Sequence, residues 1–226
     1  MASAEISIDA ILFDAYGTLF DIHGVRAAVA AVAPRPEEFV SGWRRRQLEY
    51  SWLRTLMERY VDFAQISADA LDTTAAAEGI ALASSVRTGL LAAWLRPAPY
   101  PEVPTALASL KAWPLGILSN GSPAMLATVL DHTDLTDRFA WVLSVDAVHA
   151  YKPAPIAYQM GVLATGIPRE RILFVSSNAW DVAGAAAFGF VTCWVNRSGA
   201  PLEELGQPPD LIVRGIDQLP GLLATR

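Results

Sequence analysis

Short apolar runs alternate with helical patterns over the second half of the chain. Five runs lack the strict alternation of polar and apolar residues, as is typical of parallel strands that are covered on both faces. Because helical segments separate them, the pattern predicts a parallel sheet with right-handed crossovers. The predicted strands span residues 10–14, 115–120, 141–145, 172–177 and 191–196, and the predicted helices span 102–112, 123–130, 153–164 and 181–188.

Residues 22–97 break this alternation, because they hold four helical stretches and no convincing strand. The longest predicted helix covers residues 37–60 and carries large apolar residues at helical spacing. Pro97, Pro99 and Pro101 close the region in the manner of a stiff linker. This stretch is therefore predicted to be an insertion between the first strand and the rest of the sheet.

Together these patterns predict an α/β protein with a Rossmann-like parallel sheet core and helices on both faces. Residues 1–20 and 98–226 form the predicted core, and residues 21–97 form an inserted all-helical cap over the end of the first strand. Four of the predicted strands end in polar residues. Ligands of open α/β sheets lie beyond the carboxyl ends of the strands, so this clustering predicts a functional site.

Asp14 ends the first predicted strand and enters a glycine-containing turn, with Thr18 four residues later. A carboxylate delivered in this way is a candidate nucleophile. Enzymes that hydrolyse phosphate esters with such an aspartate usually place a second Asp two residues on, where this chain has Tyr16. The tyrosine favours attack at carbon over attack at phosphorus. An Asp that only ends a strand and caps a turn is common, so the argument also needs the neighbouring elements.

Two further turns carry polar groups at the same edge of the predicted sheet. Ser119 and Asn120 end a strand ahead of a helix whose free N–H groups suit a small anion, although Ser122 could simply cap that helix. The second turn follows the fourth strand and combines Ser176, Ser177, Asn178, Trp180 and Asp181. Within it, Asp181 could be only a first-turn helix residue that the helix macrodipole favours, and Trp180 could be a core residue.

Two cationic positions complete the candidate chemistry. Lys152 follows the third strand, and a lysine that faces a carboxylate there would favour its ionised form, although most lysines are solvated. Arg44 shares a helical face with Leu48, which is unusual for a solvated arginine. Periodicity alone leaves open which of Arg44, Arg45 and Arg46 points inward.

Composition narrows the classes of function. The chain has 226 residues, is 53% hydrophobic and 18% charged, and carries a formal net charge of −6, so a sizeable core is expected. No basic stripe is present, and nucleic acid is not an expected partner. Cys193 is the only cysteine, and His23, His132 and His149 lack the spacing of metal ligands, so no bound metal is expected.

The distribution of apolar residues along the chain argues against a membrane protein. No run of about 18 apolar residues is present, and the first nine residues lack the basic and apolar segments of a signal peptide. A cytoplasmic location is therefore expected.

Taken in order, these elements resemble the haloacid dehalogenase superfamily, and within it the L-2-haloacid dehalogenases (type II), over nearly the whole chain. The resemblance rests on Asp-Ala-Tyr-Gly-Thr-Leu-Phe-Asp at 14–21, Gln-Leu-Glu-Tyr-Ser-Trp-Leu-Arg at 47–54, Leu-Ser-Asn-Gly-Ser-Pro at 118–123, Tyr-Lys-Pro at 151–153 and Ser-Ser-Asn-Ala-Trp-Asp at 176–181. One departure is Arg45, where the family often has Gln after the Trp-Arg pair.

The resemblance implies a role for each matching residue. Asp14 is implied as the nucleophile that attacks C2 of the substrate. The residues implied to hold Asp14 and the hydrolytic water are Thr18, Lys152, Ser176, Ser177 and Asp181, and those implied to accept the halide are Arg44, Asn178 and Trp180. Ser119, with backbone N–H groups near Tyr16 and Asn120, is implied to bind the substrate carboxylate. The apolar wall is implied to consist of Tyr16, Leu48 and Phe63, and Tyr158 is implied as a further contributor to the site.

The implied reaction converts a short L-2-haloacid and water into a D-2-hydroxy acid and a halide, with inversion at C2 and no cofactor. A magnesium-dependent small-molecule phosphatase of the same superfamily is the enzymatic alternative, but Tyr16 could not protonate an alkoxide leaving group. A catalytically silent binding protein is a third reading. The expected partners are a small 2-halocarboxylic acid, the halide product and a second copy in a homodimer, whereas the preferred halogen and chain length stay open.

Overall fold

The computed structural model describes residues 7–224. Residues 1–6 and 225–226 lie outside the described residues. Both segments belong to the predicted core, and residues 1–6 are also part of the N-terminal segment that was found to lack the features of a signal peptide. Six strands of the described chain form one parallel sheet in the order β3-β2-β1-β4-β5-β6. They are β1 (Ala10–Phe13), β2 (Leu115–Ser119), β3 (Trp141–Ser144), β4 (Ile172–Ser176), β5 (Val191–Val195) and β6 (Leu211–Val213).

The first five strands match the predicted ones, whereas β6 was not predicted. That strand is only three residues long and pairs on one side with β5. Its central residue, Ile212, is 57% exposed, so β6 carries too little buried apolar sequence to give a pattern. The prediction of a Rossmann-like α/β fold is confirmed.

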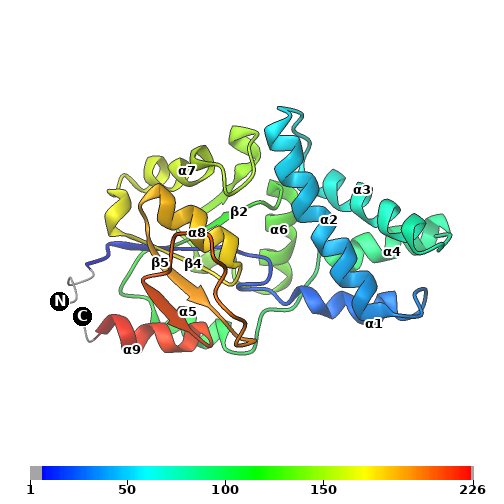
Figure 1. Ribbon diagram of the computed structural model, residues 1–226. Helices are drawn as coiled ribbons and strands as arrows, with labels where there is room; N and C mark the ends of the chain where they lie inside the picture. Colours follow the sequence, from blue (N-terminus) through cyan, green and yellow to red (C-terminus); the bar gives the residue numbers. More distant parts are fainter. Residues whose placement is uncertain (1–6, 225–226) are drawn as a thin grey trace.

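Helices cover both faces of the sheet (Figure 1). Ile11 and Phe13 of β1 join the large core with residues of α5 (Val103–Ser109), α6 (Pro123–His132) and α9 (Leu219–Ala224). Leu12 points to the opposite face, where it joins a separate cluster with Tyr158 of α7 (Pro155–Thr165) and Ala185 of α8 (Ala179–Phe188). Successive residues of a strand point to opposite faces, so β1 packs against helices on each side.

Four helices lie between β1 and α5 in the sequence and gather at one side of the sheet (Figure 1). The Trp43 ring packs 4.9 Å from the Trp94 ring, and its Nε1 donates to Ser67 O at 2.8 Å, which joins three of these helices. The four helices are α1 (Arg26–Val29), α2 (Pro36–Leu56), α3 (Phe63–Ala77) and α4 (Ser84–Trp94).

No helix of the described chain combines the length and apolar composition that a membrane crossing requires.

The predicted helix over residues 37–60 is too long, because α2 ends before residue 60. The helix stops at Leu56, and Glu58 adopts a left-handed conformation with φ of 55°, which no α-helix can contain. Leu56 is 80% exposed, so the apolar pattern continued past the point where packing supports a helix. Tyr60 consequently lies in the loop that leads to α3.

The strand order reverses beside β1, which has β2 on one side and β4 on the other. All three strands are parallel, so their carboxyl ends meet at one edge of the sheet. The side chains that follow them are Asp14, Asn120 and Ser177. The reversal of strand order is the point at which open α/β sheets bind ligands.

Candidate active site

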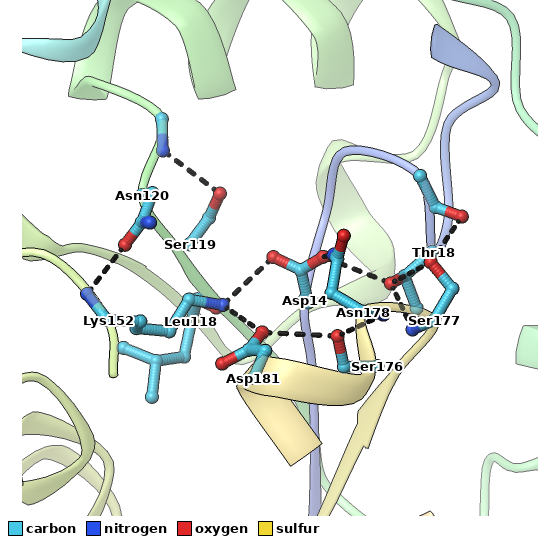
Figure 2. A network of polar contacts seen from close by, with 12 residues as sticks. Asp14, Thr18, Leu118, Ser119, Asn120, Lys152, Ser176, Ser177, Asn178 and Asp181 are labelled. Carbon is cyan, nitrogen blue, oxygen red and sulfur yellow. Dashed lines mark hydrogen bonds and ion pairs between the residues drawn. The ribbon is translucent and has the colours of Figure 1, made fainter. Parts of the chain in front are cut away.

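The Asp14 carboxylate lies directly after β1 and is only 5% exposed. Its Oδ1 accepts a hydrogen bond from Lys152 Nζ at 2.9 Å. Its Oδ2 accepts from Thr18 Oγ1 and from Asn178 Nδ2, each at 3.0 Å. Figure 2 shows these three donors converging on the carboxylate from three separate segments. They hold Asp14 in one orientation at the edge of the sheet.

Lys152 is not a solvated surface lysine, because the residue has no exposed surface. Its Nζ donates to Asp14 Oδ1 at 2.9 Å, to Asp181 Oδ2 at 2.6 Å and to Leu118 O at 3.1 Å (Figure 2). Burial lowers the pKa of Lys152, but the Asp14 and Asp181 carboxylates outweigh it and hold the pKa above its ordinary value. Lys152 therefore stays an ammonium with each of its three protons engaged.

Asp181 lies beneath this pair and is fully buried. Besides Lys152, its carboxylate accepts from Ser176 Oγ at 3.1 Å and from Tyr158 Oη at 2.8 Å. Burial raises the pKa of Asp181 above its usual range, although the Lys152 ammonium and the Tyr158 hydroxyl oppose this. Ser176 and Tyr158 hydrogen-bond to Asp181, which is linked to Asp14 through Lys152, and Ser176 Oγ also accepts from the backbone N–H of Asn178, whose side chain donates to Asp14.

The loop after β1 is held by residues that follow β4 and β5. Ser177 N donates to Thr18 Oγ1 at 2.8 Å, and Ser177 Oγ donates to Gly17 O at 2.8 Å. Arg197 donates to Gly17 O at 3.2 Å and to Thr18 O at 2.9 Å, and it pairs with Glu102 at 2.7 Å. Arg197 was not among the predicted site residues, and its available signal was a basic residue just beyond the end of a predicted strand.

A small cavity with a volume of about 10 Å³ lies over Asp14. Arg44 and Phe63 reach it from α2 and α3, whereas the other lining residues come from the carboxyl edge of the sheet. Leu48 and Tyr158 do not line it. The lining residues are Asp14, Tyr16, Arg44, Phe63, Ser119, Asn120, Gly121, Asn178 and Trp180.

Arg44 is held in this position by the packing of α2 on α3. Its Nη1 donates to Gln47 Oε1 at 3.3 Å, and Gln47 Nε2 donates to Ser67 Oγ at 3.0 Å. Its guanidinium carbon lies 6.0 Å from the centre of the Phe63 ring. Burial lowers the pKa of Arg44, and the nearby Asp14 carboxylate opposes that shift. The sequence analysis assigned no role to Gln47, although it lies one helical turn from Arg44.

The structure decides which arginine of the triplet faces the cavity. Arg45 is exposed, and Arg46 Nη1 donates instead to Gly42 O at 3.4 Å and to Thr74 Oγ1 at 3.3 Å. Only Arg44 of the three lines the cavity.

The loop between β2 and α6 forms another wall of the cavity over Asp14. Ser119 Oγ accepts from Gly121 N at 3.1 Å, and Asn120 Oδ1 accepts from Lys152 N at 3.0 Å (Figure 2). Ser122 caps α6 through its hydroxyl, so helix capping and a site at this turn coexist. Ser119, Asn120 and Gly121 bring this loop to the cavity just ahead of the N-terminus of α6, the end of a helix that favours an anion.

Within residues 7–224, no three His, Cys, Asp or Glu side chains gather in a way that could hold a metal ion. The two carboxylates at the centre, Asp14 and Asp181, share the Lys152 ammonium. The arrangement sets a fixed carboxylate and the Arg44 guanidinium around one small cavity. It is suited to displacement by a carboxylate nucleophile of a group that leaves as an anion.

A Rossmann-like sheet with a buried aspartate after β1 and an inserted helical segment defines a hydrolase of the haloacid dehalogenase-like class. The model of the haloacid dehalogenase-like hydrolase family matches residues 8–189. The chain belongs to this family.

Known proteins resemble the chain over nearly its full length. It is 48% identical over 221 residues to the (S)-2-haloacid dehalogenase of Pseudomonas sp. (strain YL), covering 96% of this chain and 95% of that protein. It is 44% identical over 220 residues to haloacetate dehalogenase H-2 of Moraxella sp. (strain B), covering 96% and 98%. It is also similar to the structure of L-2-haloacid dehalogenase from Xanthobacter autotrophicus with chloropropionic acid covalently bound, at a TM-score of 0.90 and 38% identity, covering 96% and 98%.

Proposed function

We propose that the chain is a hydrolase of carbon–halogen bonds that converts short L-2-haloacids into D-2-hydroxy acids with inversion at C2. Its relatives include proteins named (S)-2-haloacid dehalogenase and haloacetate dehalogenase. The observation that carries the proposal is that Asp14, fixed by three donors, and the Arg44 guanidinium line the same cavity. A carboxylate nucleophile and a cationic acceptor for the leaving group are what a displacement at carbon requires.

In the first proposed step, one oxygen of the Asp14 carboxylate attacks C2 of the substrate. The new C–O bond forms as the carbon–halogen bond breaks, and the halide leaves with the bonding electrons. Attack opposite the leaving group inverts C2. Arg44, Asn178 and Trp180 line the cavity where the halide would accumulate charge, and Ser119 and the N–H groups near Asn120 would bind the substrate carboxylate.

In the second proposed step, water attacks the Asp14 side-chain carbonyl and cleaves the ester. Lys152 donates a hydrogen bond to Asp14 Oδ1, whereas Thr18 and Asn178 donate to Oδ2. Whichever oxygen forms the ester, the other oxygen therefore still accepts a hydrogen bond. Such donors stabilise the developing oxyanion. The step regenerates the Asp14 carboxylate and releases the hydroxy acid, so each turnover yields one halide and one proton.

The proposal includes the predicted division into a core of residues 1–20 and 98–226 and a cap of residues 21–97. It is supported by Arg44 and Phe63, which reach the cavity from α2 and α3. A cavity of about 10 Å³ holds little more than a single water molecule. Substrate binding therefore needs more room than this cavity offers, and Arg44 and Phe63 are the lining side chains that α2 and α3 contribute. The homodimer expected from the family resemblance and the cytoplasmic location expected from the sequence belong to the same proposal.

The test is a single turnover in heavy-oxygen water with enzyme in excess over L-2-chloropropionate. The covalent route gives unlabelled hydroxy acid in the first turnover and label in the peptide that carries Asp14. Label in the first hydroxy acid would mean that water attacks carbon directly. D-2-chloropropionate and a phosphate ester, assayed in parallel, separate the proposed stereochemistry and the phosphatase alternative.

A further inference from the structure

The hydroxyl of Tyr16 is buried and has no hydrogen-bond partner among the residues that the structure describes. The residue is only 5% exposed. A buried hydroxyl without a partner is costly and rare in folded proteins, so it calls for an explanation. The side chains that contact Asp14, namely Thr18, Lys152 and Asn178, are all paired, whereas the Tyr16 hydroxyl is not.

The unpaired hydroxyl belongs to a ring that lines the cavity over Asp14. An added Cβ at Gly121 would lie 2.8 Å from Tyr16 Cε2, the ring carbon next to the one that bears the hydroxyl. Gly121 therefore lets this edge of the ring approach the loop at the start of α6. The ring position depends on a close approach that any larger residue at 121 would disturb.

The electrostatic surroundings make Tyr16 a neutral donor. Burial raises the pKa of Tyr16 well above its ordinary value, and the Asp14 carboxylate adds to this, while Arg44 opposes it. The hydroxyl therefore keeps its proton at neutral pH. A protonated donor that lines the same cavity as a guanidinium, and that no neighbouring acceptor engages, is complementary to an anion.

We propose that the Tyr16 hydroxyl donates a hydrogen bond to the departing halide, beside the Arg44 guanidinium. This role deepens the proposed dehalogenase function and rests on it. The Asp14 oxygens are already served by Thr18, Lys152 and Asn178, so Tyr16 is not needed to hold the nucleophile. The substrate carboxylate has its own donors on the Ser119 side of the cavity. The leaving halide forms only during the reaction, and the Tyr16 hydroxyl would add a neutral donor to the Arg44, Asn178 and Trp180 groups that line the same cavity.

The test compares Tyr16→Phe with the matched control Tyr60→Phe, whose hydroxyl donates to Asp146 and does not line the cavity. Halide release is measured from L-2-chloro-, L-2-bromo- and L-2-iodopropionate. We expect Tyr16→Phe to lower kcat/KM at least about tenfold for the chloride, less for the bromide and least for the iodide. Smaller halides concentrate their charge and accept stronger hydrogen bonds, which gives this order. Tyr60→Phe should show no dependence on the halogen.

Thermal stability separates a catalytic donor from a structural one. Tyr16→Phe removes a hydroxyl that has no partner in the resting protein, so its melting temperature should be equal to or above that of the wild type. A loss of activity equal for all three halogens, or no loss, would overturn the proposal. A marked fall in melting temperature would assign Tyr16 to the structure instead.

A second measurement does not depend on turnover. Sodium bromide is titrated into the resting protein at constant ionic strength, and quenching of tryptophan fluorescence reports occupancy, because Trp180 lines the cavity. The bromide Kd should rise at least about threefold in Tyr16→Phe and stay unchanged in Tyr60→Phe. Should the wild type release no halide from any haloacid, the proposed function fails while this titration still decides the role of Tyr16. Equal bromide binding by wild type and Tyr16→Phe, or no saturable binding by the wild type, would overturn the inference.

Discussion

The Lys152 ammonium lies 2.9 Å from Asp14 Oδ1 at a position without solvent exposure. The same ammonium contacts Asp181 at 2.6 Å, so one cation serves two buried carboxylates. Charges in the interior need partners, because water no longer stabilises them. The Asp14 carboxylate, the nucleophile of the proposed function, is therefore paired with a cation that the fold itself supplies.

Replacement of this cation should cost both stability and activity. Lys152→Met leaves Asp14 and Asp181 buried and facing each other, so we expect a loss of about 3–5 kcal/mol in the free energy of unfolding and no detectable halide release. Urea denaturation and a chloride assay check this. Lys111→Met, which removes the exposed lysine after α5, is the matched control and should change neither. A Lys152→Met variant as stable as the control would contradict the assigned pairing.

The arginine triplet offers an internal comparison. Arg44 lines the cavity and Arg45 is exposed, so Arg44→Ala should lower kcat/KM for L-2-chloropropionate about 10²- to 10³-fold, as deletion of a donor to a developing anion does. Arg45→Ala should stay close to the wild type, and circular dichroism should show both variants folded. A larger loss in Arg45→Ala would show that α2 presents a different face to the substrate.

Activity should not depend on a divalent metal. Lys152 already balances the Asp14 and Asp181 carboxylates, and these are the two acidic groups at the centre of the site. Dialysis against EDTA should leave halide release unchanged, and added magnesium should not raise it. A strict requirement for magnesium would favour the phosphatase chemistry of the superfamily over dehalogenation.

Buried tyrosines predict a loss of stability at alkaline pH. Burial raises the pKa of Tyr16, Tyr151 and Tyr158 in the folded state, whereas in the unfolded chain tyrosine ionises near pH 10. Above that pH the folded state binds more protons than the unfolded state, so the free energy of unfolding falls as pH rises. Each such tyrosine contributes a slope of about 1.4 kcal/mol per pH unit.

Urea denaturation between pH 8 and pH 11 measures this slope. Tyr16→Phe should reduce it by the contribution of one tyrosine, and a fully exposed tyrosine would contribute nothing. An unchanged slope in Tyr16→Phe would mean that the Tyr16 hydroxyl ionises equally readily in both states.

The sequence by itself determined five of the six described strands and the edge of the sheet at which the candidate site lies. Apolar runs without alternation mark buried parallel strands, and the carboxyl ends of such strands meet at one edge whatever the details of packing. That rule alone brings Asp14, Ser119 and Asn178 together. Residues within two to five positions of a strand end, such as Thr18 and Asp181, follow because the chain cannot move far in so few residues.

The tertiary structure decided what the helical insertion contributes. Arg44, Arg45 and Arg46 are neighbours on one helix, and helical periodicity alone does not say which face meets the sheet. The packing of α2 on α3, through Gln47 and Ser67, turns Arg44 into the cavity and leaves Arg45 in solvent. The roles of Arg197 in holding the β1 loop and of Gly121 in admitting the Tyr16 ring are also non-local. Contacts between segments far apart in the chain leave no periodic trace in a single sequence, so only the folded arrangement reveals them.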